Sequence, residues 1–273
     1  MLGSGMLEVG QHDLSPFISP EQWERNMRDV NNIKDALSDH PVFKNPCIAF
    51  FQNSQISLEQ VKAIHLDYRC AIVQIFTDAL LAAAYHATQL EEKFAMPAGV
   101  KMIPRFLLTP NFQDEFGLYI ENNQLSGSPL RAHYPLFENV LRDLNLSAQD
   151  IQGFQASDSA RHLRSFLQAH YEDFLDIIAL LAAAELQVVV FSPILRALLD
   201  WHHIDTSSGY YFVHGASTDV DSSANDDEHA NDLWKCLSLA IHHKPVADIQ
   251  NTVNHYMDLW DEFWTEQLKR VTG

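Results

Sequence analysis

The chain has little cysteine. Its three cysteines, Cys47, Cys70 and Cys236, lie far apart in 273 residues and form no Cys-x-x-Cys pair. An odd number of widely spaced cysteines excludes a disulfide framework as the basis of the fold. It also predicts a reducing, cytoplasmic setting.

Glycine and long apolar runs are scarce as well. Ten glycines in 273 residues, together with 47% hydrophobic residues, favour a mainly helical protein with a sizeable core. The longest uninterrupted apolar runs reach about half of a membrane span, so we expect no transmembrane helix. The N-terminus lacks a basic region followed by an apolar run, which argues against a signal peptide.

Acidic residues outnumber basic residues in the chain. The chain has 18 Lys and Arg against 36 Asp and Glu, a formal net charge of −18. This balance argues against nucleic acid and anionic membranes as partners. Solubility explains most of the excess, and metal-ligating carboxylates are a second source of it.

Helical patterns cover most of the chain, and no strand alternation exceeds four residues. The expected helices span residues 20–38, 57–94, 101–121, 133–144, 174–200, 227–243 and 246–271, with a further helix that begins at Ser157 or Asp158. Residues 122–129 form a polar loop. This order predicts an all-α bundle of seven to eight helices. Residues 1–15 are expected to be a disordered tail, in which 2–5 resemble a cloning remnant, and residues 16–273 a single domain.

Glu185 is the most informative residue. It is flanked by apolar residues on both sides, from Ile177 to Ala184 and from Val188 to Phe191. An ionised carboxylate buried at such a position costs several kcal/mol unless it is paired or binds a metal. The sequence therefore predicts either a neutral buried acid or a functional carboxylate.

Other carboxylates and imidazoles accompany it. Asp114 and Glu115 cannot share one helical face, so one of them is a candidate to point inward, although two surface carboxylates are the plainer interpretation. His133 starts the next helix. His214 follows an aromatic stretch, and Asp226-x-x-His229 places a carboxylate and an imidazole on one helical face. Chance pairs are common among fourteen histidines, and Asp200-x-x-His203 has the same spacing.

Taken in order, these residues resemble the haem-oxygenase-like diiron oxidases and oxygenases, which are related in fold to the thiaminase-like and pyrroloquinoline-quinone-synthesis proteins. Residues 40–46 (HPVFKNP), 56–60 (ISLEQ) and Phe76 resemble the first two helices of that superfamily. Residues 111–117 (NFQDEFG) with His133 resemble its first ligand helix. Glu185 resembles its middle-helix glutamate, and residues 211–214 with Asp226-x-x-His229 resemble its last ligand helix. The resemblance spans about residues 38–243.

The resemblance implies a non-haem diiron enzyme that binds two iron ions, activates dioxygen and oxidises a small substrate. The implied metal ligands are Glu115, His133, Glu185, His214, Asp226 and His229. An amino acid or an amino-acid-derived metabolite of natural product biosynthesis is the expected substrate, undergoing N-oxygenation, desaturation or C–C cleavage. Residues expected to bind the substrate are Arg105, Arg131, Phe112, Phe137 and Tyr211, with Arg161 as a further carboxylate clamp.

The last ligand motif departs from the superfamily pattern. That pattern is His-x-x-x-Asp-x-x-His, whereas His214 and Asp226 lie twelve positions apart (226 − 214). The intervening residues are rich in Ser and Asp, so Asp219 or Asp221 is an alternative ligand to Asp226.

Three alternatives remain. The first is an oxidative decarboxylase of fatty acids that uses the same metal site. The second is a metal-free, thiaminase-like hydrolase, for which Cys70 is the candidate nucleophile. The third is a non-enzymatic helical partner protein with a neutral Glu185. A homodimer is compatible with all of these interpretations.

Overall fold

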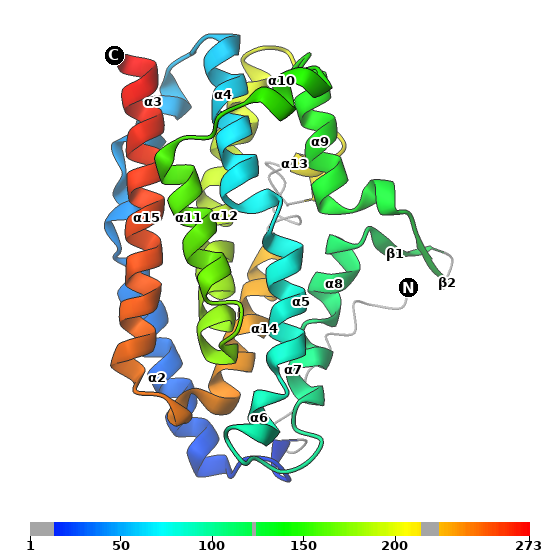
Figure 1. Cartoon of the computed structure of the whole chain (residues 1–273), viewed down its shortest axis with the longest axis vertical. Helices are drawn as coiled ribbons and strands as arrows, with labels where there is room; N and C mark the ends of the chain where they lie inside the picture. The colour runs from blue at the N-terminus through cyan, green and yellow to red at the C-terminus, as the bar shows by residue number, and fades with distance from the viewer. Residues whose placement is uncertain (1–13, 122–123, 214–223) are drawn as a thin grey trace.

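The computed structural model describes residues 14–121, 124–213 and 224–273, and the side chains of 121 and 224–228 are outside that description. Helices run mostly along the long axis of the molecule, and one hairpin projects from its side (Figure 1). The expected tail at residues 1–15 lies outside the described part, apart from Leu14 and Ser15.

The first expected helix, over residues 20–38, is present as α2 (Pro20–Ser38). The 3-10 turn η1 (Pro41–Lys44) and a short helix that was not expected, α3 (Pro46–Asn53), follow it. Ser19 caps α2 by accepting a hydrogen bond from the amide of Gln22, and Pro20 occupies the first turn, where its missing N–H costs nothing.

The helix expected over residues 57–94 is divided. It consists of α4 (Leu58–Tyr68), a π-helical turn η2 (Arg69–Val73), α5 (Phe76–His86) and α6 (Gln89–Glu92). A capping box starts α4, because the side chains of Ser57 and Gln60 each bond the other's backbone amide. A continuous helix was the wrong prediction: the π-turn adds a residue that local hydrophobic periodicity does not reveal.

The helix expected over residues 101–121 is also wrong in its second half. The structure has α7 (Met102–Leu107), α8 (Thr109–Glu115), and then β1 (Leu118–Glu121) paired antiparallel with β2 (Gln124–Gly127). Gly117, at a φ of +69°, ends the helical path and turns the chain into the hairpin. The expected polar loop is therefore largely the second strand.

The remaining helices agree closely with the prediction. A short turn η3 (Pro129–Arg131) precedes the helices α9 (His133–Asp143), α10 (Ala148–Gly153), α11 (Asp158–Ala169), α12 (Phe174–Asp200), α13 (Tyr210–Val213), α14 (Ala224–Ala240) and α15 (Val246–Thr272), with a turn η4 (Ile241–His243) before the last. Ser157, rather than Asp158, caps α11. The bundle thus contains more helical segments than the seven or eight expected.

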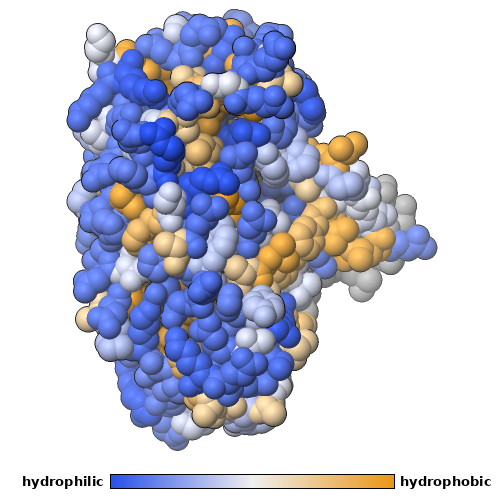
Figure 2. All heavy atoms as spheres, in the orientation of Figure 1, coloured by the Kyte–Doolittle hydropathy of each residue, from blue (hydrophilic) through white to orange (hydrophobic). Residues whose placement is uncertain are grey.

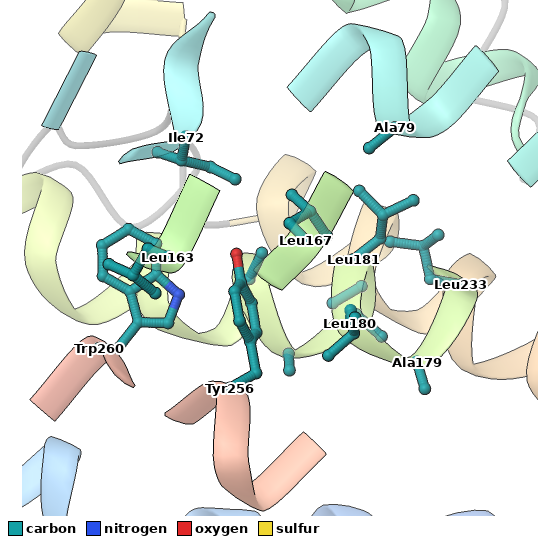
Figure 3. Packing of buried hydrophobic residues seen from close by; sticks show 14 of the residues in the cluster. Ile72, Ala79, Leu163, Leu167, Ala179, Leu180, Leu181, Leu233, Tyr256 and Trp260 are labelled. Carbon is teal, nitrogen blue, oxygen red and sulfur yellow. The ribbon is translucent and has the colours of Figure 1, made fainter. Parts of the chain in front are cut away.

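The core is built around α12. This helix packs against α14, α15, α5 and α3, and nearly all of its residues from Phe174 to Ala184 are buried without an exposed polar face. Figure 3 shows its Leu180 and Leu181 among side chains from α5, α11, α14 and α15. Burial on every side explains why the sequence of α12 has no amphipathic pattern.

Two segments are long and apolar enough to cross a membrane by composition alone, Leu58–Glu92 and Phe174–Asp200. In the second, 83% of the most apolar window is buried inside the bundle. The first is broken by the π-turn and by the ends of α5 and α6. The second segment is therefore accounted for as a helix of the protein core, whereas 44% of the most apolar window of the first is buried.

Candidate functional site

Four of the predicted ligand residues line one cavity in the middle of the bundle. They come from four different helices: Glu115 from α8, His133 from α9, Glu185 from α12 and His229 from α14. Apolar and aromatic residues complete the wall, namely Tyr68, Ile72, Val73, Phe76, Val188 and Tyr210. The cavity has a volume of about 30 Å³, enough for about two water-sized occupants.

Glu115 and His133 are joined directly. The Nδ1 of His133 donates to the Oε1 of Glu115 at 2.8 Å, and the hydroxyl of Thr77 on α5 donates to the second carboxylate oxygen at 2.6 Å. Burial lowers the pKa of His133, but the charge of Glu115 and its hydrogen bond outweigh burial and raise the pKa overall. The pair is buried, so these contacts act at low dielectric.

Asp114, the neighbour of Glu115, does not line the cavity but contacts His229, which does. Its carboxylate lies 3.1 Å from the Nε2 of His229. Of the two acidic residues, Glu115 points inward and is buried, whereas Asp114 is partly exposed and holds the imidazole. An oriented imidazole with a carboxylate on one nitrogen is the usual arrangement around a histidine ligand.

Glu185 is 4% exposed and lies on the cavity wall one turn from Val188. The other cavity wall includes the π-helical turn η2, which contributes Ile72 and Val73. Such turns occur often beside functional sites, because they offset side chains from the regular helical face.

A buried amide lies next to this constellation. Asn111 precedes Glu115 by one turn of α8 and is 1% exposed, yet neither polar atom of its side chain has a hydrogen-bond partner within the described part of the chain. Buried amides without partners are rare and usually mark an ordered water or a bound ligand.

The structure does not describe the side chains of the remaining expected ligands. His214, Asp219 and Asp221 lie outside the described residues, and the side chain of Asp226 does as well. Among the side chains that are described, no three His, Cys, Asp or Glu residues gather closely enough to hold one metal ion.

The residues expected to bind substrate are not among those that line the cavity, but one of them, Tyr211, lines the adjoining groove described below. Arg105 donates to the carbonyl of Ala84, and Arg131 stacks over the ring of Tyr119. Arg161 bonds Asp158 and the carbonyl of Ala156.

The aromatic residues in that set also have other partners. Phe112 stacks on Phe116. Phe137 is buried in the core against His65, and the hydroxyl of Tyr211 lies 3.0 Å from the Nε2 of the same histidine.

Residues that the sequence did not single out contribute to the site. Tyr68, Ile72 and Phe76 recur at helical spacing, so their common face was readable in principle. Thr77 and Asn111 carry no such signal, because their role depends on which helix packs opposite them.

An open groove adjoins the cavity. It has a volume of about 690 Å³, and Tyr210 belongs to the walls of both. Its lining is mainly polar and comes from α9 and the segment before α13, including Asn139, Arg142, Asp143, Asn145, His203, Asp205, Thr206 and Ser208.

No family model and no curated protein sequence matches the chain. Among solved structures, it is similar to a TenA homolog from Pseudomonas syringae pv. tomato str. DC3000, with a TM-score of 0.53 and 12% sequence identity over 90% of this chain and 93% of the other. The chain has a TenA-like helical fold. This confirms the predicted all-α, haem-oxygenase-like bundle, and at such low identity it shows the fold alone.

Proposed function

We propose that this TenA-like chain is a non-haem diiron enzyme that activates dioxygen and oxidises a small metabolite. The observation that carries the proposal is the convergence of Glu115, His133, Glu185 and His229 on one buried cavity. These residues are spread over 114 positions of sequence (229 − 115). Packing of an arbitrary helical core gives no reason for two carboxylates and two imidazoles to share one small space.

The types of donor atom fit iron, although no three of the described side chains lie close enough together to hold one ion as they stand. Carboxylate oxygens and imidazole nitrogens are the ligands that iron and manganese take in proteins, and no thiolate is needed. A space for about two water-sized occupants suits small ions rather than an organic molecule. The side chain of Asn111, which has no hydrogen-bond partner among the described residues, lies one helical turn from Glu115 and supports a polar occupant nearby, although Asn111 itself does not line the cavity.

The four residues would hold the metal together with His214 and one of Asp219, Asp221 and Asp226. Iron held by these residues would supply the capacity to bind and reduce dioxygen. The chain's own contribution is to fix its ligands: Thr77 orients the carboxylate of Glu115, and Asp114 orients the imidazole of His229. The apolar wall limits access of water.

The polar groove is the proposed binding site of the substrate. The cavity itself is far smaller than the 300 Å³ or more that organic ligands occupy, whereas the groove is large enough and meets the cavity at Tyr210. Its amides and mixed charges suit an amino acid or a derivative better than the alkyl chain of a fatty acid. Arg142, in place of Arg105, Arg131 or Arg161, is the candidate to bind the substrate carboxylate.

A metal-free, thiaminase-like hydrolase is the second candidate, and the likeness to a TenA homolog favours it. That reaction requires a cysteine nucleophile. Cys70 is the only half-exposed thiol of the three, but it is not among the residues that line the cavity, and burial raises its pKa. A raised thiol pKa reduces the thiolate fraction, which is the nucleophilic form.

Anaerobic titration with Fe(II) tests the proposal. We expect saturation near two ions per chain in the native protein, and weaker binding in Glu185→Gln, which keeps the shape of the side chain but removes its charge. Glu92→Gln, an exposed glutamate on α6, is the matched control and should bind iron as the native protein does. Absence of Fe(II) binding would refute the metal centre. Hydrolysis of thiamine by the metal-free protein that is lost in Cys70→Ser would establish the second candidate.

A further inference from the structure

One face of the projecting hairpin is apolar and uncovered. The register pairs Ile120 of β1 with Leu125 of β2, and directly opposed residues share one face of an antiparallel pair. These two side chains are 70% and 65% exposed. The opposite face is packed, because the guanidinium of Arg131 lies 4.2 Å from the ring centre of Tyr119.

The apolar surface continues from the hairpin onto the helices beside it. We call it the hairpin strip and define it by the exposed residues Leu81, Tyr85, Met102, Phe106, Phe116, Ile120, Leu125 and Leu130. They lie on α5, on α7, at Phe116 directly after α8, on the hairpin and on η3. Contacts join α5 to α8, α7 to α8, and α8 to β1. Figure 2 shows apolar surface running from the body of the molecule onto the projecting hairpin.

The size of the hairpin strip exceeds that of an ordinary monomer surface. Its eight side chains are between 40% and 75% exposed. Because a large side chain offers up to about 200 Å², they together expose roughly 1,000 Å². Contiguous apolar patches on monomers rarely exceed a few hundred Å², while one side of a stable protein interface needs about 800 Å². An isolated two-stranded hairpin is also only marginally stable in water.

We propose that a second copy of this chain covers the hairpin strip, with the two strips packed against each other about a two-fold axis. The chain carries a net charge of −18, so two copies repel over most of their surfaces. The side chains that define the strip are uncharged, so two strips meet without opposing like charges among these residues. An anionic membrane would repel the rest of the protein. A self-complementary patch generates a closed dimer.

The dimer would brace the candidate site. The hairpin and η3 form the connection between Glu115 and His133, which lie 18 positions apart in the chain and are bonded to each other at 2.8 Å. Covering that connection restricts its motion and so maintains the distance between the two side chains. This inference stands whether or not the cavity binds iron.

The oligomeric state of the purified full chain tests the proposal. We expect light scattering coupled to size exclusion to give twice the chain mass of 31.1 kDa. Leu125→Glu should shift this to a single chain and raise the dissociation constant by about 100-fold or more, since it buries an unpaired charge in the interface. Leu130→Glu, outside the hairpin, should act in the same direction. Helical circular dichroism and thermal unfolding confirm that each variant is folded.

Ser126→Glu is the matched control. It adds the same charge at the adjacent position, but Ser126 lies opposite Tyr119 on the other face of the hairpin, so this variant should remain a dimer. A single-chain mass for the native protein across the accessible concentration range would overturn the proposal. Dimers that dissociate equally in Leu125→Glu and Ser126→Glu, or in neither, would also overturn it.

Discussion

Glu115 ends α8, His133 begins α9, and their side chains are joined at 2.8 Å. Gly117 makes this contact geometrically feasible. Its carbonyl accepts a hydrogen bond from the amide of Ser128, which closes the base of the hairpin. A Cβ atom at Gly117 would come within 3.0 Å of backbone atoms of Ser128, Arg131 and Ala132, closer than real Cβ atoms come. The two helix ends therefore meet only because this position has no side chain.

Gly117→Ala is expected to destabilise the protein by about 2 kcal/mol or more, because it adds a steric clash with backbone to an unfavourable positive φ. Gly153→Ala is the control, since nothing lies within 4 Å of the added Cβ. Urea denaturation of the two variants measures the difference. Equal stability of both variants would show that the backbone at the base of the hairpin shifts at little cost to accommodate a Cβ. The base of the hairpin would then not fix the distance between Glu115 and His133.

The sequence predicted the buried part of the site better than its surroundings. Glu185 was identified because a carboxylate inside an apolar helix has a cost at any helical phase, and this argument needs no knowledge of the neighbouring helices. For the adjacent acids Asp114 and Glu115, two surface carboxylates were the plainer interpretation of the residues, and only the family resemblance selected Glu115. The structure turns Glu115 to the cavity and Asp114 to the rim.

The hairpin and the π-turn were missed for physical reasons. Strands of four residues show too few alternations to be distinguished from a helix end, and Gly117 alone marks the change. The π-turn within residues 69–73 conserves the apolar character of a helix while shifting its face. Contacts such as Thr77 with Glu115 depend on the packing of α5 against α8, which local sequence does not encode.

His65 is expected to make stability depend on pH. Burial lowers its pKa to about 4, against a hydrogen bond to the carbonyl of Val61 that raises it. The Nδ1 donates to that carbonyl, and the Nε2 accepts from Tyr211, so the folded protein holds the imidazole neutral. In the unfolded chain the pKa is about 6.5.

The difference between the folded and unfolded pKa values of His65 determines how stability changes with pH. Between pH 6.5 and 4 the unfolded state binds more protons than the folded state, so stability falls as the pH falls through that window, by about 3 kcal/mol in total. His65→Gln cannot be protonated and should lose this contribution. Urea denaturation at several pH values should therefore give a smaller drop for the variant than for the native protein. Parallel curves for the two proteins would contradict a neutral His65.

Arg142 is expected to bind the carboxylate of an amino-acid substrate in the polar groove. Arg142→Gln should raise the KM for substrate-triggered dioxygen uptake by about 10-fold or more, since a charge-assisted hydrogen bond is lost. Arg161→Gln is the control, because Arg161 bonds Asp158 and Ala156 instead. Uptake triggered by a medium-chain fatty acid and by no amino acid tested would favour the decarboxylase alternative.

Thr77 is expected to act on the metal through Glu115. Its hydroxyl donates to Glu115 at 2.6 Å and so leaves the opposite carboxylate oxygen directed toward His133. Thr77→Val preserves the shape of the side chain and removes the donor, so Fe(II) affinity should fall by about 10-fold or more while both metal equivalents remain. Thr109→Val is the matched control, because the Thr109 hydroxyl donates to the backbone carbonyl of Arg105 in the preceding helix α7 and not to a candidate ligand. Equal Fe(II) affinities in the two variants would mean that the carboxylate of Glu115 is positioned by the helix alone, and Thr77 would then be a packing residue.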